Sequence, residues 1–214
     1  MTIRVLIADD HKVVADGLGL LLAAQSDIEV VGTARSGREA VRTALELRPG
    51  VILMDSNMPE LNGIEATRLI RERFEEVRVL MLSVHTDAMH VVRALRAGAS
   101  GYVPKSSAGS DVVDAVRAVH AGRRYLHPSI AEAVIAQLVE PEALDDPLAR
   151  LSPREREVLQ FLAEGKGVAD IGAALSLSPR TVETYRARLM DKLDIHDVPG
   201  LVKFAILHGV TPLE

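Results

Sequence analysis

Five polar side chains in the first half of the chain follow short, nearly continuous apolar runs. They are Asp9 and Asp10 after the run 3–8, Asp55 after 51–54, Ser83 after 77–82, and Lys105 after 100–103. Clustered carboxylates repel one another and raise each other's pKa values, and a hard divalent cation removes that conflict. A carboxylate beside such a cation can attack phosphorus and form an acyl phosphate. These residue types therefore predict a Mg²⁺-dependent phosphoryl site, in which Lys105 and the metal neutralise phosphoryl oxygens and Ser83 donates a hydrogen bond.

The elements that must position these residues alternate in character. A fifth apolar run, 28–33, joins the four above, and amphipathic segments occur at 11–24, 36–47, 64–73, 87–96 and 109–121. Continuous apolar runs are typical of parallel strands buried on both faces. The alternation predicts a doubly wound α/β fold with a five-stranded parallel sheet and helices on both faces. The residues after the strands then meet at one edge of the sheet, where such folds bind ligands.

Taken singly, each of these residues has an ordinary structural explanation. An Asp after a strand is usually a turn residue or a helix cap, and Asp10 is a candidate cap for the helix that begins near His11. A Ser or a Lys in such a place is usually a surface residue. The presence of all five residues at the ends of four strands favours a functional site.

Residues 1–125 resemble a response-regulator receiver domain. The resemblance rests on the pair Asp9-Asp10, on Asp55-Ser56-Asn57-Met58-Pro59, and on Ser83, Tyr102 and Lys105 at the family's hydroxyl, aromatic and lysine positions. It implies a flavodoxin-like sheet of order 2-1-3-4-5 and phosphorylation of Asp55 by a sensor histidine kinase. It also implies Mg²⁺ held by Asp10, Asp55 and the backbone carbonyl of Asn57, with Asp9 acting through water. A coupled movement of Ser83 and Tyr102 on phosphorylation is implied as well.

Two points qualify this resemblance. Many receivers have Pro after the lysine, whereas here Pro104 precedes Lys105 and Ser106 follows it. A cis bond after the lysine is therefore excluded, and we expect altered loop geometry without loss of the site. On spacing alone, Tyr102 is also consistent with a half-buried aromatic residue of a strand.

The rest of the chain has helical periodicity. A short helix is predicted over 129–139, and the segment 140–150, with two Pro and four acidic residues, favours a linker. Further helices are predicted over 153–163, 168–175, 178–193 and 198–207. Ser152 and Glu155 form a capping box before the first of these, and Ser178 before Pro179 caps the longest. We therefore expect domains at 1–125 and 148–214, joined by a linker with a short helix over 126–147.

Segments 168–175 and 178–193 have the layout of a helix-turn-helix, whose second helix enters the major groove of DNA. Val182, Leu189 and Leu193 fall on one face and should pack inward. Arg reaches phosphate or guanine, Thr reaches phosphate or a thymine methyl, and Glu accepts from cytosine. The predicted DNA contacts are Lys166, Arg180, Thr181, Glu183, Thr184, Ala187, Arg188 and Lys192. A helical bundle with a solvated charged face is the alternative, because 180–192 has only four basic and two acidic residues.

Residues 151–193 resemble the LuxR-type helix-turn-helix, and the two halves together resemble a NarL/FixJ-type response regulator. The family often has Lys where this chain has Glu183 and a polar residue where it has Val168, which leaves the operator sequence open. The resemblance implies double-stranded promoter DNA as a partner and RNA polymerase as a further candidate. It also implies a homodimer on phosphorylation or DNA binding, formed through Leu201, Phe204 and Ala205 of the last helix. That apolar face is equally consistent with the domain's own core.

Composition excludes several other classes of protein. The 214 residues include no Cys, which excludes disulfide scaffolds, thiolate zinc sites and cysteine nucleophiles. No apolar run approaches a transmembrane length and the start lacks signal-peptide features, so a soluble cytoplasmic protein is expected. The net charge of −5 argues against a nucleic-acid partner only until it is divided along the chain. Residues 1–147 have 16 basic and 21 acidic residues, whereas residues 148–214 have nine of each.

The sequence therefore predicts a phosphorylation-dependent transcription regulator of a two-component system. It is not expected to be an enzyme beyond slow self-dephosphorylation. A Mg²⁺-dependent phosphatase or phosphotransferase that uses Asp55 is the first alternative, and the short loops after the strands argue against it. A regulator that works without phosphorylation is the second, and the intact Asp9, Asp10, Asp55 and Lys105 argue against it.

Overall fold

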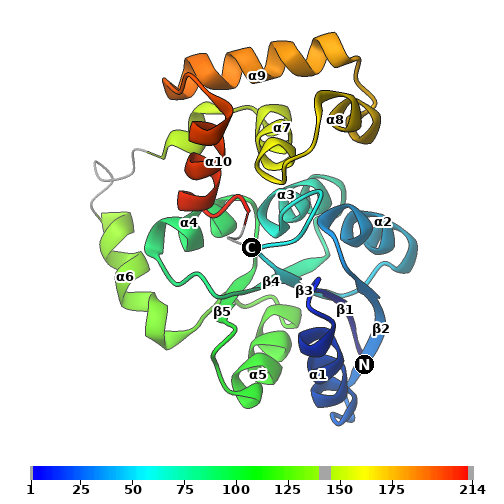
Figure 1. Ribbon diagram of the computed structural model, residues 1–214. Helices are drawn as coiled ribbons and strands as arrows, with labels where there is room; N and C mark the ends of the chain where they lie inside the picture. The colour runs from blue at the N-terminus through cyan, green and yellow to red at the C-terminus, as the bar shows by residue number, and fades with distance from the viewer. Residues whose placement is uncertain (1, 140–145, 212–214) are drawn as a thin grey trace. The chain divides into compact units, whose positions relative to one another are not determined.

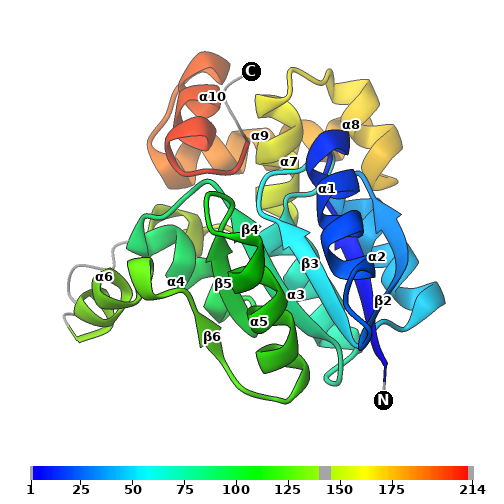
Figure 2. The ribbon, with the colours of Figure 1, turned by 90° about the horizontal axis from the view of Figure 1, so that it is seen from below.

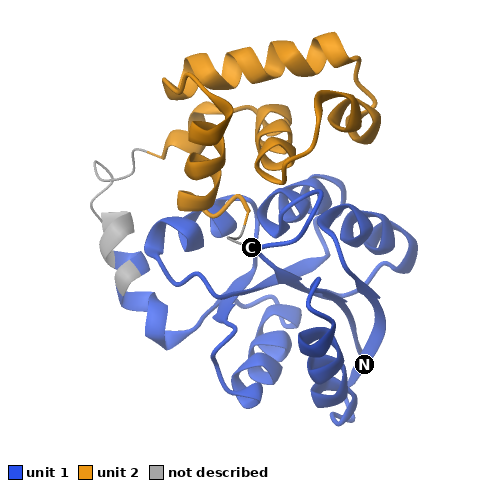
Figure 3. Ribbon diagram, in the orientation of Figure 1, with its two compact units in different colours: residues 1–144 blue, residues 145–214 orange. Residues whose placement is uncertain are grey.

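The computed structural model describes residues 2–139 and 146–211. The chain divides into two compact units, residues 1–144 and 145–214, which Figure 3 draws in different colours. Residues 126–139, which the sequence placed in a linker, belong to the first unit. Most of the predicted linker segment 140–150 lies outside the described residues.

The first unit is built on a parallel sheet of six strands in the order β2-β1-β3-β4-β5-β6. The strands are β1 (Ile3–Ala8), β2 (Ile28–Ala34), β3 (Val51–Asp55), β4 (Arg78–Ser83), β5 (Gly101–Pro104) and β6 (Tyr125–Leu126). The predicted fold class and the order of the first five strands are confirmed, but the predicted number of five strands is wrong. β6 pairs only Tyr125 with Gly101 and Leu126 with Tyr102. Two residues are too few to give a strand pattern in a sequence.

Helices cover both faces of the sheet (Figures 1 and 2). On one face, α1 (Lys12–Ala23) and α5 (Gly109–His120) pack against strand residues such as Val5 and Leu53. The other face is covered by α2 (Gly37–Leu47), α3 (Gly63–Arg73) and α4 (Ala88–Arg96). Because both faces are covered, every side chain of β3 is buried. The short helix α6 (Pro128–Val139) adds Ile130 and Val134 to the core on the α4 side.

Local capping explains where the helices of the first unit begin. Ser36, Asn62 and Asp87 accept hydrogen bonds from backbone N–H groups of the first turns of α2, α3 and α4. The idea that Asp10 caps the first helix is wrong, because His11 is the cap residue of α1 and its side chain makes no capping bond. The carboxylate of the preceding Asp9 accepts from the His11 N–H at 2.9 Å instead.

The second unit consists of helices: α7 (Pro153–Ala163), α8 (Val168–Leu175), α9 (Pro179–Leu193) and α10 (Val198–Leu207). The capping box at Ser152 and the cap at Ser178 are confirmed. A short 3₁₀ helix, η2 (Pro147–Arg150), forms the end of the segment 140–150 that the sequence predicted to be a linker. Asp146 caps η2 through the N–H of Leu148, and the side chain of Leu148 is buried in the core of this unit. In the described parts of the chain, no helix is long and apolar enough to cross a membrane.

Candidate functional site

An acidic pocket lies at the carboxyl edge of the sheet, where β1 and β3 end side by side. Asp9 and Asp55 are only 2% and 3% exposed, whereas Asp10 is about one-third exposed. One carboxylate oxygen from each of these three residues and one ring nitrogen of His11 all lie within 4.8 Å of one another. The predicted convergence of the three carboxylates is therefore present in the structure.

Lys105, which directly follows β5, enters this pocket. Its ammonium lies 2.7 Å from Oδ2 of Asp55 and 2.8 Å from Oδ2 of Asp9. Burial lowers the pKa of Lys105, but the attraction of Asp55 and Asp9 outweighs burial and the pKa is raised overall. The lysine therefore stays charged and partly neutralises the two buried carboxylates.

The ionised form of Asp55 is nevertheless disfavoured unless a further cation is bound. Burial raises its pKa from 3.8 to about 6, and repulsion from Asp9 adds to this effect. The ammonium of Lys105 and the N–H of Asn57, 3.3 Å from Oδ1, act in the opposite direction and do not compensate fully. An additional positive charge in the pocket would favour the ionised form.

We predict a pH-dependent stability that originates from Asp55. Its pKa in the folded state is above the ordinary value, so the folded state binds the proton more tightly than the unfolded chain. The contribution to stability is complete below about pH 3.8 and is lost as the pH rises through about 6. Two pKa units correspond to about 3 kcal/mol. In urea unfolding without divalent metal, the free energy of unfolding of the wild type relative to Asp55→Asn should fall as the pH rises through about 6. Parallel pH profiles of the two proteins would contradict the prediction.

The pocket fits a hard divalent cation such as Mg²⁺. Its donors are carboxylate oxygens, which Mg²⁺ prefers, and the partly exposed Asp10 leaves room for water ligands. Burial is the main cause of the raised pKa of Asp55, and Lys105 offsets it only in part, so a bound cation would favour the ionised carboxylate.

The two predicted switch residues are linked through one backbone segment. The hydroxyl of Tyr102 donates to the carbonyl of His85 at 2.7 Å, and the N–H of His85 donates to Oγ of Ser83 at 3.0 Å. Tyr102 is fully buried, so the reading of this residue as half-buried is wrong; the helices that cover the sheet enclose it. Burial also raises the pKa of its phenol.

Three residues that shape this pocket, Ser56, His85 and Gly63, had no role predicted from the sequence. Oγ of Ser56 lies 2.6 Å from Oγ of Ser83, and Nε2 of His85 lies 2.9 Å from Nδ2 of Asn57. At Gly63, a Cβ atom would lie 1.8 Å from the carbonyl oxygen of Asp55, so only glycine allows α3 to approach β3 there. No sequence pattern marks these positions, because the contacts depend on how β3, β4 and α3 pack.

The unusual Pro104–Lys105 order leaves the lysine in place. No cis peptide bond occurs among the described residues. The N–H of Lys105 donates to the carbonyl of Ser83 at 2.8 Å, and the N–H of Ser107 closes a turn on the carbonyl of Pro104. The prediction that the site persists despite the departure agrees with this geometry.

In the second unit, α9 presents one exposed face. Arg180, Thr184, Ala187 and Arg188 are exposed, whereas Val182 and Leu189 on the opposite face are completely buried. Within the described ranges, the side chains of Arg180 and Arg188 pair with no acidic group. The hydroxyl of Thr184 donates to the carbonyl of Arg180. Of the remaining predicted contacts, Thr181 is hydrogen-bonded to Ser178, Glu183 pairs with Arg186 at 2.7 Å, and Lys166 lies exposed before α8.

Lys192 has a different environment from the other predicted DNA contacts. Its ammonium lies 2.7 Å from Oε2 of Glu155 and 3.3 Å from the carbonyl of Arg150. Glu155 is 3% exposed, and burial raises its pKa, but the bonds from Lys192 and Ser152 lower the pKa overall. This geometry points to a structural role for Lys192.

We therefore predict that Lys192→Met destabilises the second unit. The substitution leaves the buried carboxylate of Glu155 without its cation, and because Lys192 is itself partly exposed the loss should be about 1–2 kcal/mol. Thermal or urea unfolding measures it. Lys166→Met is the matched control and should change stability by less than about 0.5 kcal/mol. Equal stability of the two variants would argue for a surface role of Lys192.

The predicted dimer residues of α10 do not share one environment. Leu201 and Ala205 are completely buried in the core of their own unit, which corrects their assignment to a dimer surface. Phe204 is half-buried and packs on His208, with ring centroids 4.2 Å apart. The outer face of α10 is instead apolar and hollowed. An apolar groove of about 580 Å³ is lined by Val198, Pro199, Val202, Lys203, Ile206 and Leu207.

Comparison with known proteins shows which family each unit resembles. The model of the response regulator receiver domain matches residues 5–117, and that of bacterial regulatory proteins of the luxR family matches residues 149–205. The response regulator UvrY of Escherichia coli K12 is 39% identical over 99% of this chain and 97% of its own. RcsB of Salmonella typhimurium has 26% identity, a TM-score of 0.67, and coverage of 97% of this chain and 98% of its own. A structure of two RcsB dimers bound to two parallel DNAs has 26% identity, a TM-score of 0.60, and coverage of 99% and 100%.

Together, the doubly wound unit with its acidic pocket and the helix-turn-helix unit define a two-domain signalling regulator. The chain belongs to the response regulators of two-component systems that combine a receiver domain with a LuxR-type DNA-binding domain. It is thus a phosphorylation-dependent transcription regulator and not a classical enzyme, which argues against the phosphatase alternative.

Proposed function

We propose that Asp55 accepts a phosphoryl group from a sensor histidine kinase. The single observation that supports this most strongly is the position of Asp55, which is buried at the end of β3 between Asp9 and the ammonium of Lys105. Lys105 is placed to neutralise phosphoryl oxygens, and Ser83 at the end of β4 has a hydroxyl that can donate to them. In slow self-dephosphorylation, water hydrolyses the acyl phosphate, which releases inorganic phosphate and restores the carboxylate of Asp55.

Asp9, Asp10, Asp55 and the backbone carbonyl of Asn57 are the residues that would hold Mg²⁺. Bound there, the metal supplies positive charge to the phosphoryl group and to the carboxylates. Asp9 already holds Lys105 and the N–H of His11, so its role is to orient the pocket and to act through water.

Ser83 and Tyr102 form the proposed switch. Both are connected to His85, one through its N–H and the other through its carbonyl. A phosphoryl group that draws the hydroxyl of Ser83 towards Asp55 must disturb this arrangement and bias the surface around β4 and α4. Such differential binding shifts a population between two conformations.

The recognition helix is α9, and Arg180, Thr184, Ala187 and Arg188 are its proposed contacts to promoter DNA. Their spacing of i, i+4, i+7 and i+8 places them on one face, which is the exposed face. Thr181, Glu183 and Lys166 flank this face, and Lys192 is the weakest of the predicted contacts. RNA polymerase stays a candidate partner.

A homodimer is proposed through the outer face of α10, because its groove is apolar and the related RcsB is seen as dimers on DNA. We predict that Val202→Glu lowers the affinity for a two-half-site DNA at least about tenfold, since a charge at an apolar contact is costly. Leu201→Ala should act differently: it should lower thermal stability, because Leu201 is core. Analytical ultracentrifugation with DNA measures assembly, and undiminished dimerisation of Val202→Glu would exclude this face.

The proposed function is tested by genome-wide DNA occupancy of the wild type and of Asp55→Ala. We expect discrete promoter sites whose occupancy drops in the variant. Identical profiles would point to the regulator that works without phosphorylation. An absence of discrete sites in both would exclude the DNA-binding proposal.

A further inference from the structure

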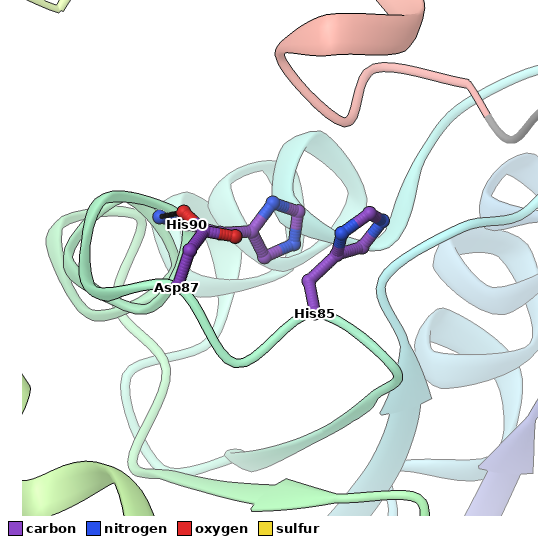
Figure 4. Close-up of side chains that lie close together, drawn as sticks. All are labelled: His85, Asp87 and His90. Carbon is purple, nitrogen blue, oxygen red and sulfur yellow. Dashed lines mark hydrogen bonds between the residues drawn. The ribbon is translucent and has the colours of Figure 1, made fainter.

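A second cluster of metal-ligating side chains lies at the start of α4, outside the acidic pocket. His85, Asp87 and His90 each offer one ligand atom, and these atoms lie within 4.8 Å of one another. Figure 4 shows the three side chains gathered where the loop after β4 leads into α4. Oδ1 of Asp87 accepts from the backbone N–H of His90 at 2.9 Å, so the helix cap holds the Asp87 side chain next to the backbone of His90.

The imidazole of His90 supplies a second, independent observation. His90 is 2% exposed, and its Nε2 has no hydrogen-bond partner among the described residues. Buried polar atoms are nearly always satisfied, so one without a partner calls for an unseen ion or water. Burial, followed by the charge on His85, lowers the pKa of His90 to about 4. Its ring is therefore neutral near pH 7, which is the form that binds metals.

We propose that His85, Asp87 and His90 bind a divalent transition-metal ion and that Zn²⁺ matches them best. Two imidazole nitrogens and one carboxylate are typical ligands of Zn²⁺, and the exposed Asp87 leaves a fourth position open to water. The rings of His85 and His90 are stacked, with centroids 4.6 Å apart and planes at 29°. Ring lone pairs lie in the ring plane, so binding requires the less buried His85 ring to rotate out of the stack.

Metal binding at His85 would reach the phosphoryl pocket, and this consequence rests on the proposed function. Nε2 of His85 contacts Asn57, its N–H donates to Ser83, and its carbonyl accepts from Tyr102. Rotation of the His85 ring would break its contact with Asn57, and a metal that anchors His85 to α4 would restrain the backbone contacts to Ser83 and Tyr102. We therefore expect bound Zn²⁺ to slow the formation of acyl phosphate on Asp55 at least severalfold.

The test measures Zn²⁺ affinity of the full-length chain by competition with a chromophoric chelator in excess Mg²⁺, which is expected to fill the acidic pocket. We expect one Zn²⁺ per chain, bound at least about tenfold more weakly by His85→Gln, His90→Gln and Asp87→Asn. Asp87→Asn keeps a capping side chain, so its loss of affinity does not reflect a damaged helix. His196→Gln, at an exposed histidine, and Asp55→Asn are the controls and should bind Zn²⁺ like the wild type.

Each remaining outcome has a defined meaning. The site is overturned if the wild type binds no Zn²⁺, if the three variants bind it as well as the wild type, or if Asp55→Asn alone loses it. In the last case Zn²⁺ occupies the acidic pocket. Acyl-phosphate formation measured with and without Zn²⁺ separates the two proposals. If Zn²⁺ binds as expected and no acyl phosphate forms in either condition, the proposed function fails and the metal site stands.

Discussion

Asp55→Asn should abolish covalent labelling of the chain by a small phosphodonor such as radiolabelled acetyl phosphate with Mg²⁺. Asn has nearly the same shape as Asp but no anionic oxygen that could attack phosphorus, so the loss should exceed about 100-fold. Labelled protein is quantified on gels, and hydroxylamine releases the label if it is an acyl phosphate. After treatment with the phosphodonor, Asp55→Asn should bind promoter DNA only as tightly as the untreated wild type does.

Two comparisons make this result specific. Asp114→Asn removes a carboxylate that is 72% exposed on α5 and should label like the wild type. Asp55→Asn should also be more stable than the wild type at neutral pH without metal, because Asp55 is ionised there at a cost. The stability measurement therefore identifies a variant that fails to label only because it is unfolded. Hydroxylamine-resistant label that persists in Asp55→Asn would place phosphorylation on a hydroxyl, for example that of Ser56 or Ser83, and would contradict the proposal.

The sequence predicted the pocket better than its surroundings. Asp9, Asp55 and Lys105 could be placed together because parallel strands end at one edge, which is a consequence of topology alone. The contacts of Ser56 and His85 could not be predicted, since they depend on side-chain directions at the ends of β3 and β4. Many strand boundaries differ by one residue from the predicted ones, and among the strands of the described residues the two-residue β6 was not predicted.

In the second unit, too, the sequence predicted the faces of single helices better than the contacts between helices. Periodicity correctly assigned Val182 and Leu189 to the inner face of α9, because a single helix fixes which residues share a face. It could not decide which apolar residues of α10 face the core. Leu201 and Ala205 are core residues and Val202 and Ile206 line the outer groove. That choice depends on how α10 packs on its neighbours.

Arg188→Ala should lower the affinity for a specific promoter site about 10- to 100-fold, equivalent to about 1–3 kcal/mol. Arg188 is exposed on the same face of α9 as Arg180 and Thr184, and the guanidinium pairs with no acid in the described parts of the chain. Its charge is therefore available to DNA without first breaking an ion pair.

The mode of contact of Arg188 can be read from two further measurements on the same variant. Contact with guanine relaxes base preference at one position, whereas contact with phosphate weakens all sequences equally and lowers the salt slope by about one. Arg123→Ala removes the same charge from an exposed position in the first unit and is the matched control. If Arg188→Ala and Arg123→Ala both bind like the wild type, α9 does not carry this contact. If both weaken binding equally, net charge explains the effect and a specific role for Arg188 is excluded.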